Sequence, residues 1–298
     1  NSASGGRRSI VIALLTAPAL VLIAVIFGWP MLRYVWLSFH ADSVLTGLQP
    51  VANGGANWLR LLADDRFWID AGQTARFALL SVGLELILAL GMALLLNQSW
   101  RGRGAARAIT LLPWALPTTM MALGWRWIFN TPYGPIEALV SSVGIEPLDL
   151  LSTPSITWLV TVFADVWKTT PFITLILLAG LQTIPEDLYN AFRLEGGSAS
   201  QALRAITLPL LLPYILLSLL FRLAQAFGVF DLVQVLTSGG PAGTTESLAL
   251  YAYLNGMRFL DFGYSATVMV AGFLLLTMLI VLGTVLLRGM GLLRAMER

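Results

Sequence analysis

The sequence predicts an all-α integral membrane protein with six transmembrane helices, and its composition and apolar runs carry this prediction. Of its 298 residues, 57% are hydrophobic and 11% are charged, whereas about 25% of the residues of soluble proteins are charged. The mean hydropathy is +0.78. A helix needs about 20 consecutive apolar residues to cross a bilayer. Six runs reach that length: Ile10–Leu32, Gly72–Leu96, Ala108–Phe129, Ser155–Leu181, Leu208–Leu236 and Phe262–Leu287.

The distribution of arginines predicts the orientation of these helices, because cytoplasmic loops carry an excess of basic residues. One set of connecting segments holds Arg7, Arg8, Arg101, Arg103, Arg107, Arg193, Arg204, Arg288, Arg294 and Arg298. The other set holds most of the acids, namely Asp42, Asp64, Asp65, Asp70, Glu137, Glu146, Asp149, Glu246 and Asp261. We therefore expect both termini, and the polar stretch 183–209 that we call the elbow, in the cytoplasm. The expected regions are a cytoplasmic tail at 1–9, a transmembrane domain at 10–290 and a second cytoplasmic tail at 291–298.

The sequence argues against several kinds of chemistry. It has no cysteine and a single histidine, His40, so it offers neither a thiolate nor a histidine-based metal site. Its only lysine, Lys168, is not preceded by the Gly-x-x-x-x-Gly of a phosphate-binding loop. We therefore predict a chain that is not itself an enzyme and that binds no metal, cofactor or nucleic acid. The first apolar run is too long for the apolar part of a cleavable signal peptide.

One segment on the predicted outer side has a helical pattern of its own. Trp58–Asp70 places Leu61, Leu62 and Trp68 between charged positions, as in a short helix that lies on the membrane surface before the second run. We interpret it as a packing helix without a ligand. Farther along, the loop 236–261 opens with a Thr-Ser-Gly-Gly-Pro sequence that lacks the lysine of a phosphate site.

Polar residues lie at membrane depth in the fourth and fifth runs, and they are site hypotheses because a buried charge is costly in a bilayer. In the fourth run Asp165, Thr169 and Phe172 recur at i, i+4 and i+7, so they share one helix face. In the fifth run Arg222 and Gln225 share a face. Carboxylate, hydroxyl, amide and guanidinium groups beside aromatic rings suit a hydroxyl-rich solute such as a sugar.

A second interpretation of these charges stays open. Lys168 flanks the polar face of the fourth run, and Glu85 lies midway along the second run and needs a partner. Asp165, Lys168, Arg222 and Glu85 could neutralise one another within the helix bundle instead of binding a solute.

The elbow carries helix signals of its own. Thr183 with Glu186, and Ser198 with Gln201, have the spacing of capping boxes, in which each side chain satisfies a free backbone N–H at a helix start. The glycine pair at 196–197 ends the first helix, because glycine adopts the left-handed conformation without steric cost. We expect a short helix, a tight turn and a second short helix that leads into the fifth run.

The elbow resembles the EAA loop of bacterial ABC importer permeases. The family pattern reads Glu-Ala-Ala, two residues, Asp-Gly-Ala, eight residues, then Ile-x-Leu-Pro. At that spacing the chain keeps Ala191, Gly196, Ile206, Leu208 and Pro209. It departs from the pattern at Asn190, Phe192, Glu195 and Gly197. The run from Trp167 to Phe172 also looks like the trehalose, maltose and glycerol-phosphate class of these permeases.

This resemblance, which covers about residues 10–287, implies a type I importer permease in the inner membrane of a bacterium. It implies four kinds of partner: a second homologous permease, two ATPase subunits that bind ATP and Mg²⁺, an extracytoplasmic substrate-binding protein, and membrane lipid. The elbow would contact the ATPase through Tyr189, Asn190, Ala191, Arg193, Glu195, Gly196 and Gly197. A sugar delivered by the binding protein would contact Asp165, Thr169, Phe172, Arg222, Gln225 and Lys168.

Two other functions remain open on the sequence. A permease for amino acids or an oxyanion would share the elbow and would use Arg222 and Lys168 as anchors for the anionic cargo. A membrane-embedded enzyme would need catalytic acids, and only the scattered outer-side residues Asp64, Asp65 and Asp70 could serve.

Overall fold

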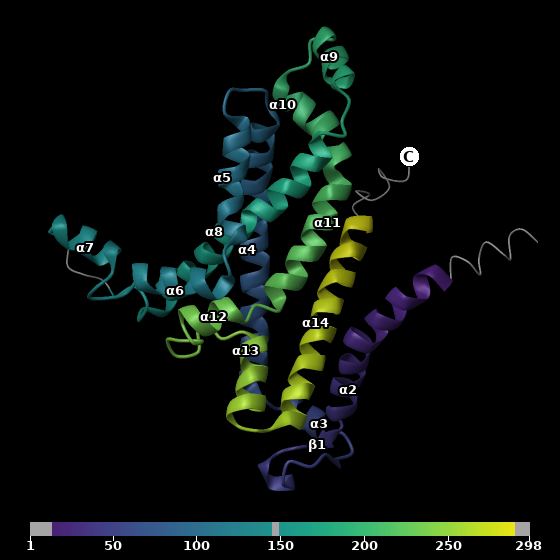
Figure 1. The fold of residues 1–298 in the computed structure, drawn as a ribbon, viewed down its shortest axis with the longest axis vertical. Coiled ribbons are helices and arrows are strands. Elements are labelled where there is room, and N and C mark those ends of the chain that lie inside the picture. Colours follow the sequence, from purple (N-terminus) through teal and green to yellow (C-terminus); the bar gives the residue numbers. More distant parts are fainter. Residues whose placement is uncertain (1–13, 145–148, 290–298) are drawn as a thin grey trace, which may run out of the picture. The chain divides into compact units, whose positions relative to one another are not determined.

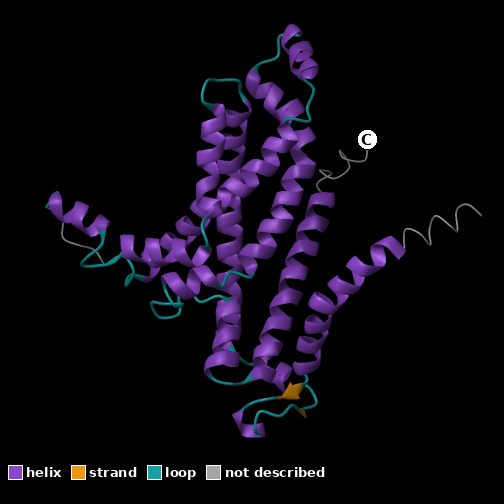
Figure 2. Cartoon of the chain, in the orientation of Figure 1, coloured by secondary structure: helices purple, strands orange, loops and turns teal. Residues whose placement is uncertain are grey.

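The structure, a computed structural model, describes residues 14–144 and 149–289, and it is mostly helical (Figures 1 and 2). The predicted tails at 1–9 and 291–298 lie outside these residues. Strands β1 (His40–Ala41) and β2 (Val51–Ala52) pair antiparallel, with His40 opposite Ala52. Within the described part, five helices are long and apolar enough to span a membrane: Leu14–Leu37, Asp65–Asn97, Pro154–Leu181, Ala199–Phe227 and Phe262–Gly289. The all-α membrane class is thereby confirmed, while the count of six spans stays a prediction.

The third predicted run is two helices, so the expectation of one unbroken helix over Ala108–Phe129 was wrong. Helix α5 (Arg103–Ala115) ends where Leu116 takes extended backbone angles, and α6 (Thr118–Ile128) follows Pro117. The cause is local: a residue before proline disfavours the helical region because the proline ring clashes with it.

The fifth predicted run starts earlier and ends earlier than expected. Its helix extends over Ala199–Phe227 and comprises α10 (Ala199–Ala202), the π-helical turn η3 (Leu203–Thr207) and α11 (Leu208–Phe227). Gly228 ends it, and 231–236 form a separate helix, α12 (Asp231–Leu236).

The described residues divide into two compact units, of which the first comprises residues 14–67 and 251–273. Its described helices are the π-helical turn η1 (Ala24–Gly28), α2 (Trp29–Leu37), the 3₁₀ turn η2 (Val44–Thr46), α3 (Ala56–Leu62), the end of α13 (Leu248–Tyr253), η4 (Leu254–Arg258) and the first part of α14 (Phe262–Gly289). The buried Asn57 amide ties the unit together by donating to the carbonyls of Ser38 and His40, at 3.3 and 3.0 Å. Helix α3 confirms a short helix ahead of the second span, although that span itself already begins at Asp65.

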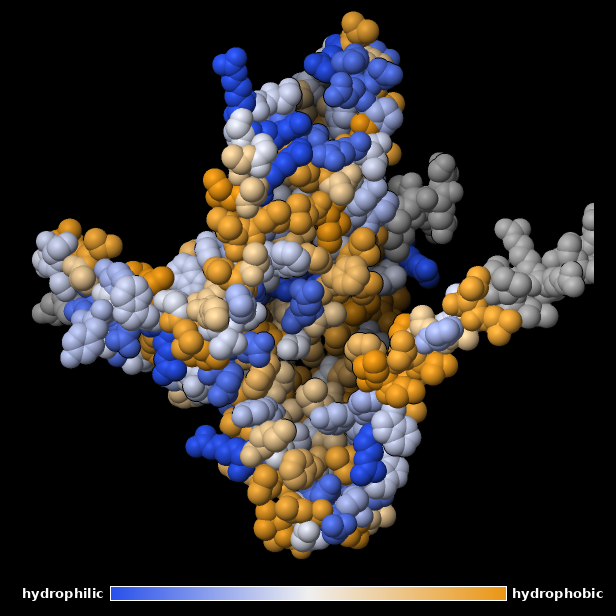
Figure 3. All heavy atoms as spheres, viewed as in Figure 1, coloured by the Kyte–Doolittle hydropathy of each residue, from blue (hydrophilic) through white to orange (hydrophobic). Residues whose placement is uncertain are grey.

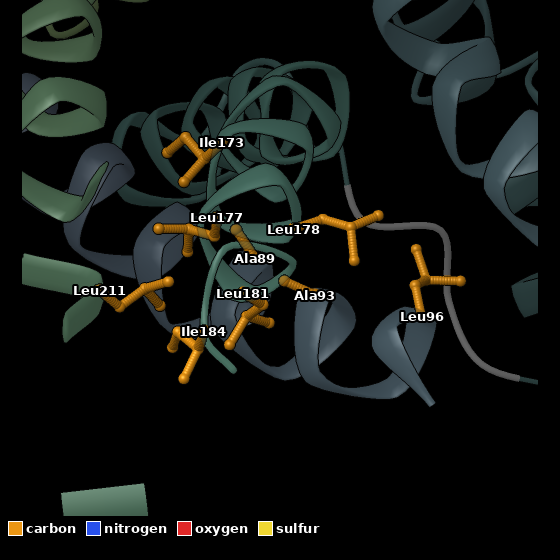
Figure 4. Packing of buried hydrophobic residues seen from close by; sticks show 9 residues of the cluster. All are labelled: Ala89, Ala93, Leu96, Ile173, Leu177, Leu178, Leu181, Ile184 and Leu211. Atoms are coloured by element: carbon orange, nitrogen blue, oxygen red, sulfur yellow. The ribbon is translucent and has the colours of Figure 1, made fainter. Parts of the chain in front are cut away.

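The second unit comprises residues 68–144, 149–250 and 274–289. It contains α4 (Asp65–Asn97) from Trp68 onward, α5, α6, α7 (Pro135–Ser142), α8 (Pro154–Leu181), α9 (Glu186–Leu194), α10, η3, α11 and α12. Close packing of α8 on α11 depends on Gly180, where a Cβ atom would lie 2.6 Å from the ring of Tyr214. The apolar core of this unit, drawn in Figure 4, comes from α4, α8, the loop after α8 and the start of α11: Ala89, Ala93, Leu96, Ile173, Leu177, Leu178, Leu181, Ile184 and Leu211.

Candidate functional site

A buried cluster of charges joins three helices of the second unit. Glu85 of α4 is fully buried. Arg222 of α11 donates two hydrogen bonds to it, from Nε to Oε2 at 2.6 Å and from Nη2 to Oε1 at 2.8 Å. The same Nη2 donates to Oδ2 of Asp165 on α8 at 2.9 Å. Planar two-point pairing of this kind is the strongest geometry available to an arginine and a carboxylate. With both acids ionised, the cluster holds one positive and two negative charges.

Two polar side chains complete the cluster. The Thr169 hydroxyl lies 2.7 Å from Oε1 of Glu85 and 2.6 Å from the carbonyl oxygen of Asp165. Gln225 accepts from Nη1 of Arg222 at 3.0 Å, and its side chain is otherwise exposed. The amide of Gln225 is therefore the exposed group of the cluster, while its charged side chains are buried.

Lys168 and Phe172 lie apart from this cluster. The Lys168 ammonium donates to the carbonyl oxygen of Leu116 at 2.5 Å and lies 3.5 Å from that of Trp114, so it holds the end of α5 against α8. Phe172 stacks on Trp114 at 5.9 Å between ring centroids and meets Phe221 edge-on at 6.4 Å.

The structure thus brings together four of the six residues proposed to bind a sugar, namely Asp165, Thr169, Arg222 and Gln225. It adds Glu85, which the sequence identified only as a carboxylate in need of a partner. In the described structure Lys168 makes neither an ion pair nor a hydrogen bond with Asp165, Glu85 or Arg222, because its ammonium donates to backbone carbonyls instead. Whether these residues contact a sugar stays a prediction.

A small pocket in the second unit was not predicted. Its residues include several with polar side chains, although most of its exposed surface is apolar, and the loop after α12 closes one side. The backbone N–H of Leu248 donates to Thr74 of α4 at 3.0 Å, and Ser247 donates to the carbonyl of Val229 at 2.6 Å, so this loop is folded back onto the helices. The lining residues are Gln73, Thr74, Phe77, Trp158, Thr161, Val229, Val233, Thr244, Thr245, Glu246 and Ser247.

The elbow forms the predicted helix, turn and helix, with one correction at its start. Thr183 does not cap α9: its hydroxyl donates back to Gly180 at 2.7 Å, and α9 starts after Pro185. The proline delays the helix start because its ring disfavours the helical region for the preceding residue, Ile184, and Pro185 itself is the residue before the helix. At the second helix the capping box of Ser198 and Gln201 is confirmed.

Gly196 and Gly197 shape the turn for different reasons. Gly196 has φ +84°, the left-handed conformation predicted for it. At Gly197 a Cβ atom would collide with the ring of Phe192 and lie 2.8 Å from its carbonyl oxygen. The two departures from the family pattern at 192 and 197 therefore compensate each other in volume, since the larger ring occupies the space that a methyl group would fill.

Helix α9 is anchored on one side and exposed on the other. Tyr189 lies against the apolar core and its hydroxyl is 3.0 Å from that of Thr207. Asn190 accepts a hydrogen bond from Arg193 at 2.8 Å. Leu194, at the end of the helix, is 90% exposed. This end of α9 is therefore accessible for contact with another protein.

A second carboxylate network lies in the first unit. Asp64 accepts hydrogen bonds from the hydroxyls of Tyr251 and Tyr264 and from the backbone N–H groups of Arg66 and Phe67. Burial alone would raise the pKa of the Asp64 carboxyl, but these hydrogen bonds outweigh it and hold that pKa below its ordinary value. Asp64, one of the three acids that a membrane enzyme could have used, is thus engaged as a hydrogen-bond acceptor.

Comparison with known proteins gives consistent results. Residues 85–293 match the family described as binding-protein-dependent transport system inner membrane component. The chain is 41% identical to the trehalose/maltose transport system permease protein MalF of Thermococcus litoralis, over 88% of each chain. It is 36% identical to the sulfoquinovosyl glycerol transport system permease protein SmoG of Agrobacterium fabrum, over 88% of this chain and 85% of that one.

A solved structure has the same fold. A chain of a bacterial alginate ABC transporter, crystallised in complex with an alginate pentasaccharide-bound periplasmic protein, superposes with a TM-score of 0.79 at 18% identity. The alignment covers 95% of this chain and 96% of that chain.

Proposed function

The chain belongs to the family of binding-protein-dependent transport system inner membrane components, and from this premise we propose that it is a permease subunit of a sugar importer. The observation that carries the proposal is its 41% identity, over 88% of both chains, to a trehalose/maltose permease. The cargo would be a di- or oligosaccharide or a sugar derivative, delivered by an extracytoplasmic binding protein. A second permease subunit would complete the pathway.

The geometry of the cluster supports a neutral cargo over an anionic one. An anion would need a cationic anchor, but Arg222 is already shared by two carboxylates and Lys168 donates to backbone carbonyls. The exposed Gln225 amide offers both a donor and an acceptor, which is what a sugar hydroxyl requires. We assign direct sugar contact to Gln225 and Phe172. Arg222 holds the Gln225 side chain by its hydrogen bond, and Asp165 in turn holds the Arg222 guanidinium. Thr169 acts one step farther away, by its hydrogen bond to Glu85.

We assign the energy source to a separate ATPase that presses on α9. Closure of the ATPase would move the elbow as a rigid lever, because Tyr189 and the Ser198 capping box fix both of its helices. The exposed Leu194 is the apolar contact on the permease side. ATP and Mg²⁺ would be bound by that partner.

The cargo is tested by uptake into vesicles that hold the complete importer. We expect labelled trehalose, maltose or a related glycoside to accumulate, and unlabelled sugars to compete, while amino acids and sulfate do not. If amino acids or sulfate inhibited uptake and sugars did not, the cargo would be anionic or zwitterionic and not a sugar.

The coupling role is tested at Gly196. Gly196→Val forces a β-branched residue into a left-handed conformation, which costs about 1–2 kcal/mol or more, although nothing lies within 4 Å of the new side chain. We expect uptake to be abolished while the protein remains in the membrane. Gly47→Val is the matched control, since Gly47 has φ +65° and open space but lies in the other unit. Equal uptake by both variants would refute the lever.

A further inference from the structure

Three arginines lie close together where α4 ends and α5 begins, and the proposed transport role does not use them. Arg101 is exposed, Arg103 and Arg107 are half-buried, and we call the three the arginine turn. The sequence has no acid from residue 86 to residue 136. Within the part of the chain that the structure describes, none of the three has a carboxylate within ion-pair distance.

The end of α4 fixes two of these side chains. Arg107 donates from Nη2 to the carbonyl of Leu96 at 3.0 Å, and Arg103 donates from Nη1 to that of Gln98 at 3.4 Å. The Nε of Arg107 is buried without a hydrogen-bond partner. Each guanidinium has five N–H donors in a planar fork, so most of the donors on the arginine turn remain for an anion.

The surface beside the arginine turn is apolar. Leu95, Ile109 and Leu112, on the adjoining turns of α4 and α5, each expose more than half of their surface. Trp100 is partly exposed, and its indole N–H donates to the carbonyl of Leu95 at 3.2 Å, an arrangement typical of tryptophan at a membrane–water boundary. Figure 3 shows hydrophilic residues gathered over the end of α4 and α5, with apolar residues beside them along the helices.

We propose that the arginine turn binds the phosphate of an anionic phospholipid in the leaflet on the arginine-rich side of the membrane. The guanidinium groups would bind the phosphate oxygens, and the acyl chains would lie along Leu95, Ile109 and Leu112. Lipid is favoured over a protein partner because the cationic donors border directly on an apolar helical surface, with Trp100 at the boundary. Arginines near an anionic membrane surface contribute about fivefold in affinity each.

The test compares lipid binding by two charge-matched variants of the full chain. R101Q/R103Q removes two charges from the turn and keeps the hydrogen bond of Arg107 to the Leu96 carbonyl of α4, while R126Q/R258Q removes two charges elsewhere. Native mass spectrometry of the purified proteins, titrated with phosphatidylglycerol or phosphatidylcholine, reports the lipids bound. We expect wild type and R126Q/R258Q to prefer phosphatidylglycerol, R101Q/R103Q to bind it about 25-fold more weakly, and R101K/R103K to recover part of the loss.

Each other outcome overturns the proposal in its own way. Equal binding of both lipids, or an equal loss in both charge-matched variants, would mean that the arginine turn is not the site. Displacement of phosphatidylglycerol by millimolar inorganic phosphate would assign the donors to a soluble anion. If R101Q/R103Q kept phosphatidylglycerol but lost the ATPase on purification, the patch would be a protein contact. These readouts do not depend on which solute is transported.

Discussion

Two carboxylate networks in this protein solve the same physical problem with different donors. In the second unit, Glu85 and Asp165 are satisfied by the Arg222 guanidinium, and these side chains are nearly inaccessible to water. In the first unit, Asp64 is satisfied by two neutral tyrosine hydroxyls. Arg60 and Arg66 lie over the faces of the rings of Tyr264 and Tyr251, at 3.7 and 5.0 Å from the ring centroids.

The difference teaches how the surroundings select the donor. A carboxylate inside a bundle within a membrane has no water to solvate it, so only an opposite charge with good geometry offsets the cost of burying it. Asp64 stands at the beginning of α4, outside the membrane-spanning helices, where neutral donors suffice. The nearby Arg60 does not pair with Asp64: it pairs with Asp261 at 2.7 Å and lies over the Tyr264 ring. We therefore expect loss of one partner to lower the free energy of unfolding more in the cluster around Arg222 than in the network around Asp64.

Removal of Arg222 should have the largest effect. Arg222→Ala leaves two buried carboxylates without their cation and should lower the free energy of unfolding in detergent by about 3–5 kcal/mol. Thermal and denaturant unfolding of the purified protein measure it. The triple variant E85M/D165N/R222M removes all the charges and should recover most of the stability. Wild-type stability in Arg222→Ala would show that the cluster is not closed to water.

Loss of one tyrosine hydroxyl should cost less. Tyr264→Phe keeps the ring that supports Arg60 and removes one donor to Asp64, so it should cost about 1.5–3 kcal/mol, the range for a hydrogen bond to a charged group. The same measurement on D64N/Y264F gives the control. If Tyr264→Phe destabilised D64N as much as it destabilises wild type, the hydroxyl would act through something other than Asp64.

Acid should weaken the network around Asp64. Because the folded pKa of Asp64 lies below its ordinary value, its contribution is complete above about pH 4, the ordinary carboxyl range, and is lost as pH falls through the lowered folded pKa. Hydrogen exchange followed from pH 6 to pH 3, corrected for intrinsic rates, should show reduced protection around 64, 251 and 264. Asp64→Asn should remove this dependence. A dependence unchanged in that variant would place the titrating group elsewhere.

Lys168 should show the smallest effect. Lys168→Met removes donation to the Leu116 and Trp114 carbonyls at the end of α5 and should cost about 1 kcal/mol, with sugar uptake preserved. Uptake and unfolding measured on the same preparation separate the two roles. Loss of uptake at unchanged stability would indicate that Lys168 contacts the sugar.

Local signals accounted for the features that were predicted correctly. The left-handed Gly196 and the Ser198–Gln201 box follow from residues within a few positions of each other. Local signals also explain the two places where the predicted helix boundaries were wrong. Pro117 breaks the third run, and Pro185 moves the start of α9. In both places the proline ring disfavours the helical conformation for the residue that precedes it.

The sequence by itself determined the membrane class, the position of the apolar runs and the shape of the elbow, because hydropathy, capping and glycine conformation act over short stretches of chain. Only the tertiary structure decided that Glu85 pairs with Arg222, 137 residues away, that Lys168 stays outside their cluster, and that Phe192 fills the space beside Gly197. Those outcomes depend on which helix faces meet and at what depth. Such long-range geometry is not encoded by the spacing of residues along one helix.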